Sequence, residues 1–140
     1  MIPQIQRGSV ASKQVVFSFL NDTTLVSGGR AFLPPGSAIG SATESKVYSY
    51  LPFDCTIKNL RVLTSGAQDG SGTVTVTLRD NAGATALVAT VTAGGAAGLY
   101  TDLTHAVAIA AGHAIDLDFK NNATATSAPV ATITFEIDPS

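Results

Sequence analysis

The residues with the clearest chemical potential lie late in the chain, around one histidine and two aspartates. His113 precedes Asp116 and Asp118, which are two residues apart and on an extended strand would project from the same face. Their oxygens could share a calcium ion, but such a site takes about six to eight oxygen ligands, and only two carboxylates are local. We therefore expect no metal, and we expect Asp116 and Asp118 to form the solvent side of a strand whose core side is Ile115, Leu117 and Phe119.

Catalysis by a nucleophile would require a serine or cysteine beside a histidine, with a carboxylate behind it. The chain has His105, His113 and Cys55, but no serine stands in a Gly-x-Ser-x-Gly turn. No Lys-Ser or Lys-Thr pair follows the glycines of segment 94–98, which indicates a flexible turn, or a close approach of backbones at an assembly axis, rather than a phosphate loop. The residues therefore predict a protein that is not an enzyme and binds no cofactor.

Three segments alternate apolar and polar side chains with a period of two residues, which is typical of half-buried strands. In 73–79 the valines and the leucine share one face and the threonines share the other, and 113–119 and 131–137 repeat the pattern. The strands are separated by small Gly, Asn, Asp and Ala turns, whereas parallel βαβ units need helices between strands. The chain is therefore predicted to be all-β.

Further strands are predicted from β-branched and aromatic runs closed by turn residues. A shift of phase at Lys58 and Asn59 indicates a bulge, and segment 80–83 is typical of a hairpin turn. The other predicted strands cover residues 13–20, 30–33, 45–53, 56–64, 86–92 and 106–110. About eight or nine strands with irregular turn spacing favour an antiparallel two-sheet β-sandwich, a jelly roll, over an up-and-down barrel.

The length of 140 residues suits one core and not two. We divide the chain into a short extended N-terminal arm, residues 1–12, and a single β-sandwich domain, residues 13–140. Charged residues make up 13% of the chain, against about 25% in an average soluble domain. The surface is therefore expected to be partly covered by a neighbouring subunit, unless Thr, Ser and Asn alone solvate it.

Charge and hydropathy exclude two classes of partner. The net charge is −2 and the basic residues are scattered, which argues against nucleic acid. No apolar run reaches the about 18 to 20 residues of a membrane span, and residues 1–7 lack the pattern of a secretory signal. The protein is therefore expected to fold where it is made, and its one cysteine, Cys55, to be a buried thiol in a reducing compartment.

Candidate contacts with a partner come from two segments. The arm carries Ile2, Ile5 and Val10, which an extended segment could place in a groove or along a sheet edge of another subunit; a frayed terminus is the alternative. A predicted strand places Tyr48 and Tyr50 on its more polar face. These side chains are the predicted contact residues.

Three stretches have a recognisable pattern of turns and strands: 33–36 (LPPG), 51–62 (LPFDCTIKNLRV) and 75–81 (TVTLRDN). They resemble small jelly-roll domains of tailed-bacteriophage and prophage structural proteins, which are similar to the trimeric β-sandwiches of the tumour necrosis factor and complement type. The late turn and the closing asparagines of that pattern correspond to 111–113 and 120–122, with His113 in place of the usual acid. The resemblance covers roughly residues 23–137.

The resemblance implies a non-enzymatic structural protein of the virion. In the first role, a capsid decoration or cement protein binds the lattice of the major capsid protein as a homotrimer and stabilises the head shell. The alternative is a receptor-binding tip or baseplate module of a phage tail fibre, although the chain contains no coiled-coil or repeat shaft. The expected location is the capsid surface, after folding in the host cytoplasm.

Overall fold

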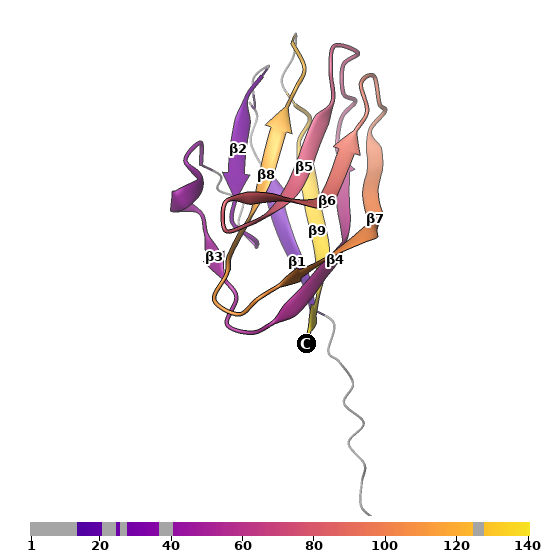
Figure 1. Ribbon diagram of the computed structural model, residues 1–140. Helices are drawn as coiled ribbons and strands as arrows, with labels where there is room; N and C mark the ends of the chain where they lie inside the picture. Colours follow the sequence, from indigo (N-terminus) through magenta and orange to yellow (C-terminus); the bar gives the residue numbers. More distant parts are fainter. Residues whose placement is uncertain (1–13, 21–24, 26–27, 37–40, 125–127) are drawn as a thin grey trace, which may run out of the picture.

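Two antiparallel sheets stack as layers in the computed structural model, which describes residues 14–20, 25, 28–36, 41–124 and 128–140 (Figure 1). Sheet A has the strand order β1 (Gln14–Leu20), β9 (Ala131–Pro139), β4 (Cys55–Thr64), β7 (Gly98–Ile109). Sheet B has the strand order β2 (Arg30–Leu33), β8 (Ala114–Asn121), β5 (Val74–Asp80), β6 (Gly83–Val91), and β3 (Ser49–Tyr50) also pairs with β8.

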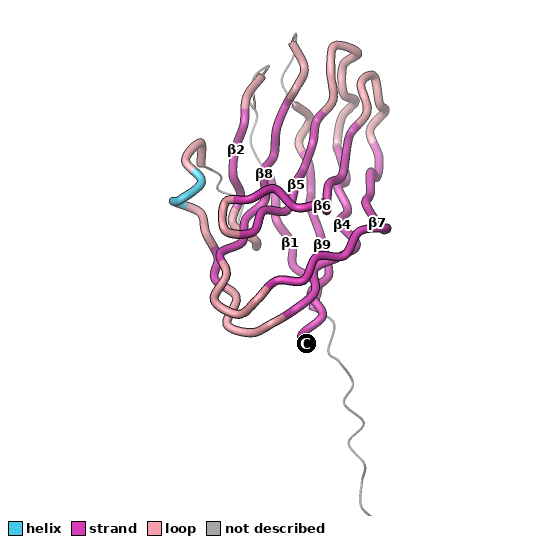
Figure 2. Tube along the Cα trace, in the orientation of Figure 1, coloured by secondary structure: helices cyan, strands magenta, loops and turns pink. Residues whose placement is uncertain are grey.

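A turn of 3-10 helix, η1 (Glu44–Lys46), lies beside sheet B (Figure 2). Within the described ranges, no helix is long and apolar enough to cross a membrane.

The strands pair in a nested order that makes the sandwich a jelly roll. β1 pairs with β9, β2 with β8, β4 with β7 and β5 with β6, in each case antiparallel. This is the pairing of one long hairpin, wrapped so that its successive pairs alternate between sheet A and sheet B. The predicted all-β jelly roll is confirmed.

The predicted alternation builds the core between the sheets. In β5, Val74, Val76 and Leu78 are fully buried, whereas the threonines between them are partly exposed. The inner faces of the other strands contribute further large side chains, among them Ile57, Leu60, Leu117, Phe119, Ile133 and Phe135. Full burial of such a side chain contributes about 1.5 to 3 kcal/mol, so this continuous core stabilises the fold.

The predicted irregularity at Lys58 and Asn59 is a β-bulge. The pairing of β4 with both of its neighbours shifts there, and Asn59 has a φ of 55°. Asparagine tolerates this left-handed backbone better than most residues. Because the bulge adds a residue, Ile57 and Leu60 both face the core, which simple alternation does not allow.

The predicted hairpin turn at 80–83 joins β5 to β6. Asn81 and Ala82 have φ values of 46° and 64°, and two successive positive φ angles form the type I′ turn that matches the twist of a hairpin. The side-chain oxygen of Asn81 also accepts the N–H of Ala114 at 2.9 Å. The turn is thereby tied to the start of β8.

Three strand predictions are wrong in extent, and the smallest of the three differences is that β6 begins at Gly83 and not at residue 86. Residues 45–53 do not form one strand: they contain the end of η1 and the short β3, because Glu44 turns toward Arg79 of sheet B. The predicted strand 106–110 is the end of β7, which begins at Gly98. Where β7 pairs with β4, its residues 103–105 lie opposite the single residue Asn59, so the alternation of β7 is interrupted and does not reveal its full length.

Candidate functional site

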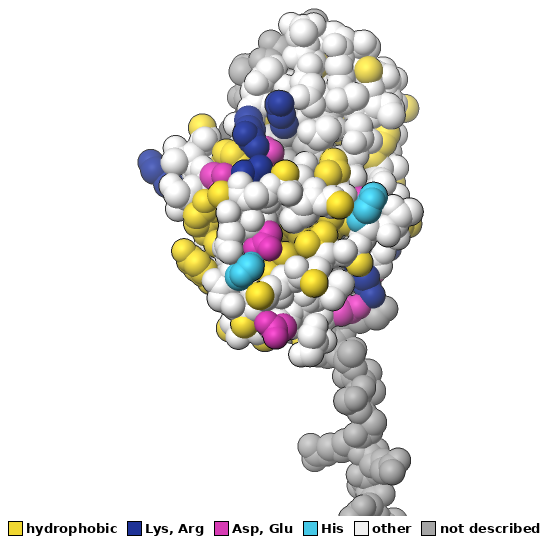
Figure 3. All heavy atoms as spheres, in the orientation of Figure 1, with side chains coloured by type: hydrophobic (Ala, Val, Ile, Leu, Met, Phe, Trp, Pro, Cys, Tyr) yellow, Lys and Arg dark blue, Asp and Glu magenta, His cyan; other side chains and the backbone are white. Residues whose placement is uncertain are grey.

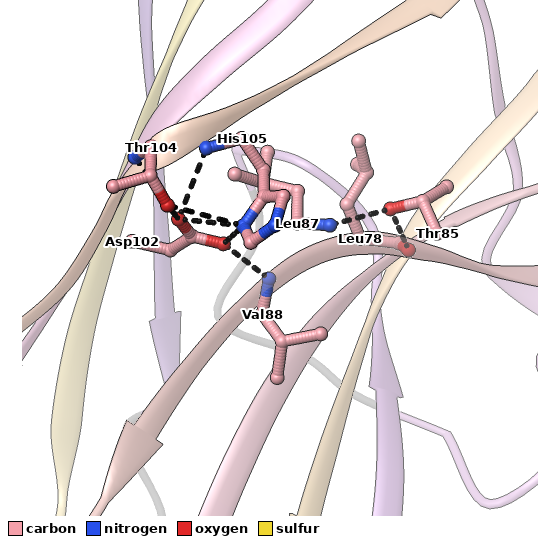
Figure 4. A network of polar contacts seen from close by, with 7 residues as sticks. All are labelled: Leu78, Thr85, Leu87, Val88, Asp102, Thr104 and His105. Atoms are coloured by element: carbon pink, nitrogen blue, oxygen red, sulfur yellow. Dashed lines mark hydrogen bonds and ion pairs between the residues drawn. The ribbon is translucent and has the colours of Figure 1, made fainter.

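A network of polar contacts at Asp102 of β7 joins the edges of the two sheets (Figure 4). Asp102 is only 7% exposed. Its Oδ1 accepts the backbone N–H groups of Thr104 at 3.1 Å and His105 at 3.2 Å. Its Oδ2 accepts the N–H of Val88 at 3.0 Å. Val88 lies on β6, the edge strand of sheet B, so Asp102 connects sheet A to sheet B.

These hydrogen bonds keep Asp102 ionised. Burial by itself raises the pKa of this carboxyl, but hydrogen bonds from Val88, His105 and Thr104 favour the charged form and outweigh burial. The pKa of Asp102 is therefore well below its usual range.

The same residues have the composition of a catalytic relay but not its geometry. Nδ1 of His105 lies 2.8 Å from Oδ2 of Asp102, and the hydroxyl of Thr104 lies 3.3 Å from that same nitrogen. In a relay the hydroxyl contacts the other ring nitrogen. The arrangement therefore fastens a turn within β7 and offers no activated nucleophile.

A second group of charged side chains gathers on the outer face of sheet B, over β2, β8 and β5 (Figure 3). Arg30 donates to both carboxylate oxygens of Asp118, at 2.7 and 2.5 Å. Arg79 donates to both carboxylate oxygens of Glu44, at 2.5 and 3.2 Å. Asp116 lies opposite Arg79 in the pairing of β8 with β5. We call these residues the sheet B cluster.

The sheet B cluster corrects the expectation that Asp116 and Asp118 form the solvent side of β8. They do lie on the face opposite the core residues of that strand, but Asp116 is fully buried and Asp118 is 7% exposed. Segment 41–51 covers this face, since its Glu44 binds Arg79 and its β3 pairs with β8. Alternation predicts the side of a sheet that a residue occupies, but not whether another segment covers that side.

Asp116 differs from the other acids of the cluster because neither of its carboxylate oxygens meets a donor. Burial, and then the charge of Glu44, raise the pKa of Asp116 to about 7. A fully buried carboxyl without a donor is the most unusual polar group among the described residues.

His113 does not join Asp116 and Asp118, with which its spacing groups it. Its Nδ1 lies 2.7 Å from Oδ1 of Asp80, at the end of the β5–β6 hairpin. In the part of the chain that the structure describes, no group of three or more His, Cys, Asp or Glu side chains could hold a metal ion.

Of the predicted partner contacts, the structure describes the two tyrosines. Tyr50 of β3 is 69% exposed, and Tyr48 is partly buried. Ile2, Ile5 and Val10, with the rest of the arm, lie outside the described residues.

Exposed apolar side chains on the outer face of sheet A were not predicted. Leu63 of β4 pairs directly with Leu99 of β7, and the two are 52% and 59% exposed. Leu103, further along β7, is 53% exposed, and Val130, just before β9, is 38% exposed. We call these four residues the apolar strip. Alternation could have identified Leu63, because it follows the core residue Val62.

In comparisons with known proteins, no family model and no curated protein matches the chain. Function is therefore inferred from the fold, the apolar strip and the resemblance of the three sequence stretches.

Proposed function

We propose that the protein is a capsid decoration, or cement, protein: a non-enzymatic virion protein that binds the lattice of a major capsid protein as a homotrimer and stabilises the head shell. The observation that carries the proposal is the apolar strip, which places large aliphatic side chains on the outside of a folded sandwich. Contiguous exposed apolar surface marks sites of contact with other proteins, and in the strip Leu63 and Leu99 are direct cross-strand neighbours. The resemblance to phage jelly-roll domains supplies the virion as the setting.

The apolar strip suits contact between copies of this chain. On the same outer face, Arg61 forms an ion pair with Glu136 at 3.5 Å, and Lys58 forms one with Asp138. Charges beside the strip are thus neutralised within the subunit, which lowers the cost of removing this face from water. An apolar, charge-compensated face is stabilised by burial against another subunit, and the low charge of the whole chain, 13%, favours the same interpretation.

Attachment to the shell is assigned to the arm. Its Ile2, Ile5 and Val10 could bind as an extended segment in a groove of the capsid protein. A trimer would present three such arms at once, and linked binding segments raise occupancy far above that of one segment alone.

The subunit contact is tested by placing a charge in the apolar strip. Leu99→Glu should convert the trimer to a monomer, because the carboxylate would be buried against leucine in the interface. Thr90→Glu is the matched control, since Thr90 is exposed on sheet B, away from the strip. Light scattering at micromolar concentration measures the mass. A wild-type chain that is monomeric throughout would exclude the trimer, and a trimeric Leu99→Glu variant would exclude this face.

The role is tested with particles assembled from the major capsid protein of the same genome. The wild-type protein should co-sediment with full particles, and mild denaturant should strip it while the shell survives. Leu99→Glu should bind more weakly than Thr90→Glu. Binding to host cells and not to particles would instead support the tail-fibre tip, for which the exposed Tyr50 is a contact candidate.

A further inference from the structure

Residues 41–51 form a cover over the outer face of sheet B, and we call them the cover segment. At one end Ser41 exchanges two backbone hydrogen bonds with Phe32 of β2, at 2.8 and 2.9 Å. At the other end β3 pairs with β8, and the N–H of Leu51 donates to the carbonyl of His113 at 3.1 Å. Between these ends, Glu44 binds Arg79.

The cover segment buries apolar and charged groups together. Val47 of the cover is 8% exposed and Phe32 of β2 is 6% exposed. The guanidinium groups of Arg30 and Arg79 lie over the Phe32 ring, 4.6 and 5.6 Å from its centre. Asp116, on the same face, is fully buried. A charge at that position would be held away from water.

Charged and titratable groups face Asp116 from every element around it. They are Glu44 and Tyr48 of the cover segment, Arg79 of β5, Arg30 of β2 and Asp118 of β8 itself. The hydrogen bonds of Arg79 go to Glu44 and the carbonyl of Ala82, and those of Arg30 go to Asp118. Neither arginine donates to Asp116, whose two oxygens have no donor.

The geometry brings a second carboxylate, that of Glu44, toward Asp116, because Glu44 binds Arg79 and Arg79 lies opposite Asp116 in the pairing of β5 with β8. Two ionised carboxylates repel each other and cannot form a hydrogen bond, whereas a protonated carboxyl can donate to an ionised one. Glu44 has lone pairs to spare, because a carboxylate has about four acceptor sites and Arg79 uses one on each of its oxygens.

We propose that Asp116 is a proton-binding site: it carries a proton while the cover segment is closed and donates it in a hydrogen bond to Glu44, which fastens the cover to sheet B. No covalent bond changes, and the proton comes from and returns to water. The raised pKa of Asp116, about 7, supports the assignment. Tyr48 and the exposed Tyr50 belong to this cover.

The direction of the pH dependence follows from linkage. An aspartate in an open, hydrated cover has a pKa of about 4, whereas Asp116 under the closed cover has a pKa of about 7. Between these values the closed state retains a proton that the open state has lost, so raising the pH favours opening. The opening equilibrium should therefore increase up to about tenfold per pH unit between about pH 4 and 7, and level off above that.

The test combines hydrogen exchange with a direct titration. Exchange of the Ser41 and Leu51 amides, which donate to the backbone carbonyls of Phe32 and His113 outside the cover, is measured from pH 4 to 8 and corrected for intrinsic rates. Wild-type protein should show the rise in opening. Asp116→Asn should show a pH-independent opening, because its amide can donate to Glu44 without titrating. Asp138→Asn, on sheet A, is the control and should behave like wild type.

The titration needs no variant, since carbon-detected NMR of the wild-type side-chain carboxyls gives the pKa of Asp116 directly. A measured pKa near 4 would overturn the proposal, as would a pH-dependent opening that persists in Asp116→Asn. These readouts concern the purified chain alone. The exchange and titration experiments can therefore exclude the proton-binding site without excluding the capsid role. The particle-binding experiment can likewise exclude the capsid role without excluding the proton-binding site.

Discussion

At the scale of single residues, two buried aspartates show how neighbours decide ionisation. Asp102 accepts three backbone N–H groups and its pKa is lowered. Asp116 meets no donor and its pKa is raised. Folding therefore favours the charged form of one and the neutral form of the other. The stabilisation by Asp102 is present above about pH 4 and is lost as the pH falls below that value.

Asp102→Ala should lower the free energy of unfolding by about 2 to 4 kcal/mol, because the N–H groups that it accepts lose a charged acceptor. Equilibrium unfolding in urea at pH 7 measures the loss. Asp54→Ala is the matched control: Asp54 accepts the N–H of Ala111 at 2.7 Å in an exposed position, and its loss should cost about 1 kcal/mol or less. Equal losses in the two variants would show that Asp102 is not a special link between the sheets.

At the scale of elements, the β5–β6 hairpin has a regular turn, but one residue of that turn is not of the type that its backbone conformation favours. Its type I′ turn puts Ala82 at a φ of 64°, a conformation that glycine adopts without cost and alanine does not. The hydrogen bond that the Asn81 side chain accepts from the N–H of Ala114, and the pairing of β5 with β8, keep the turn in place. Tertiary contacts therefore hold a residue in a conformation that its own side chain disfavours.

Ala82→Gly should stabilise the protein by about 0.5 to 1 kcal/mol, since it removes the steric cost of the left-handed backbone. Ala84→Gly is the control, because Ala84 lies two residues further, within β6 and opposite Arg79. There glycine should destabilise by about 0.5 to 1 kcal/mol. Thermal or urea unfolding of both variants gives the comparison, and destabilisation by Ala82→Gly would contradict the assigned turn.

At the scale of the whole molecule, the jelly roll closes around a core that contains the cysteine. Cys55 opens β4, is 1% exposed, and packs in the same cluster as Ile57. Burial, and then the charge of Asp54, raise the pKa of the thiol, which disfavours its reactive thiolate form. Reagents should reach the sulfur only when the sandwich opens.

Labelling of Cys55 by a thiol reagent at pH 8 should therefore be at least about a hundredfold slower in the native protein than in urea, because a stable domain opens rarely. The rate should rise with denaturant along the unfolding curve. Rapid stoichiometric labelling under native conditions would mean that the start of β4 is exposed in solution.

Local alternation by itself determined most of the fold. The period of two in 73–79, 113–119 and 131–137 identified β5, β8 and β9 and the faces that they bury. The break in phase at Lys58 and Asn59 located the bulge, and 80–83 located the hairpin. These features are encoded by neighbouring residues, because strand geometry and turn conformation depend on side chains a few positions apart.

Only the tertiary structure decided what lies on the outer faces of the sheets. Asp116 and Asp118 are buried because Glu44, far away in the chain, pairs with Arg79 and brings the cover segment over them. On sheet A nothing among the described residues covers Leu63 and its cross-strand neighbour, so an apolar face stays open. Alternation separates the core side of a strand from its other side, but the environment of that other side depends on long-range contacts that no local pattern records.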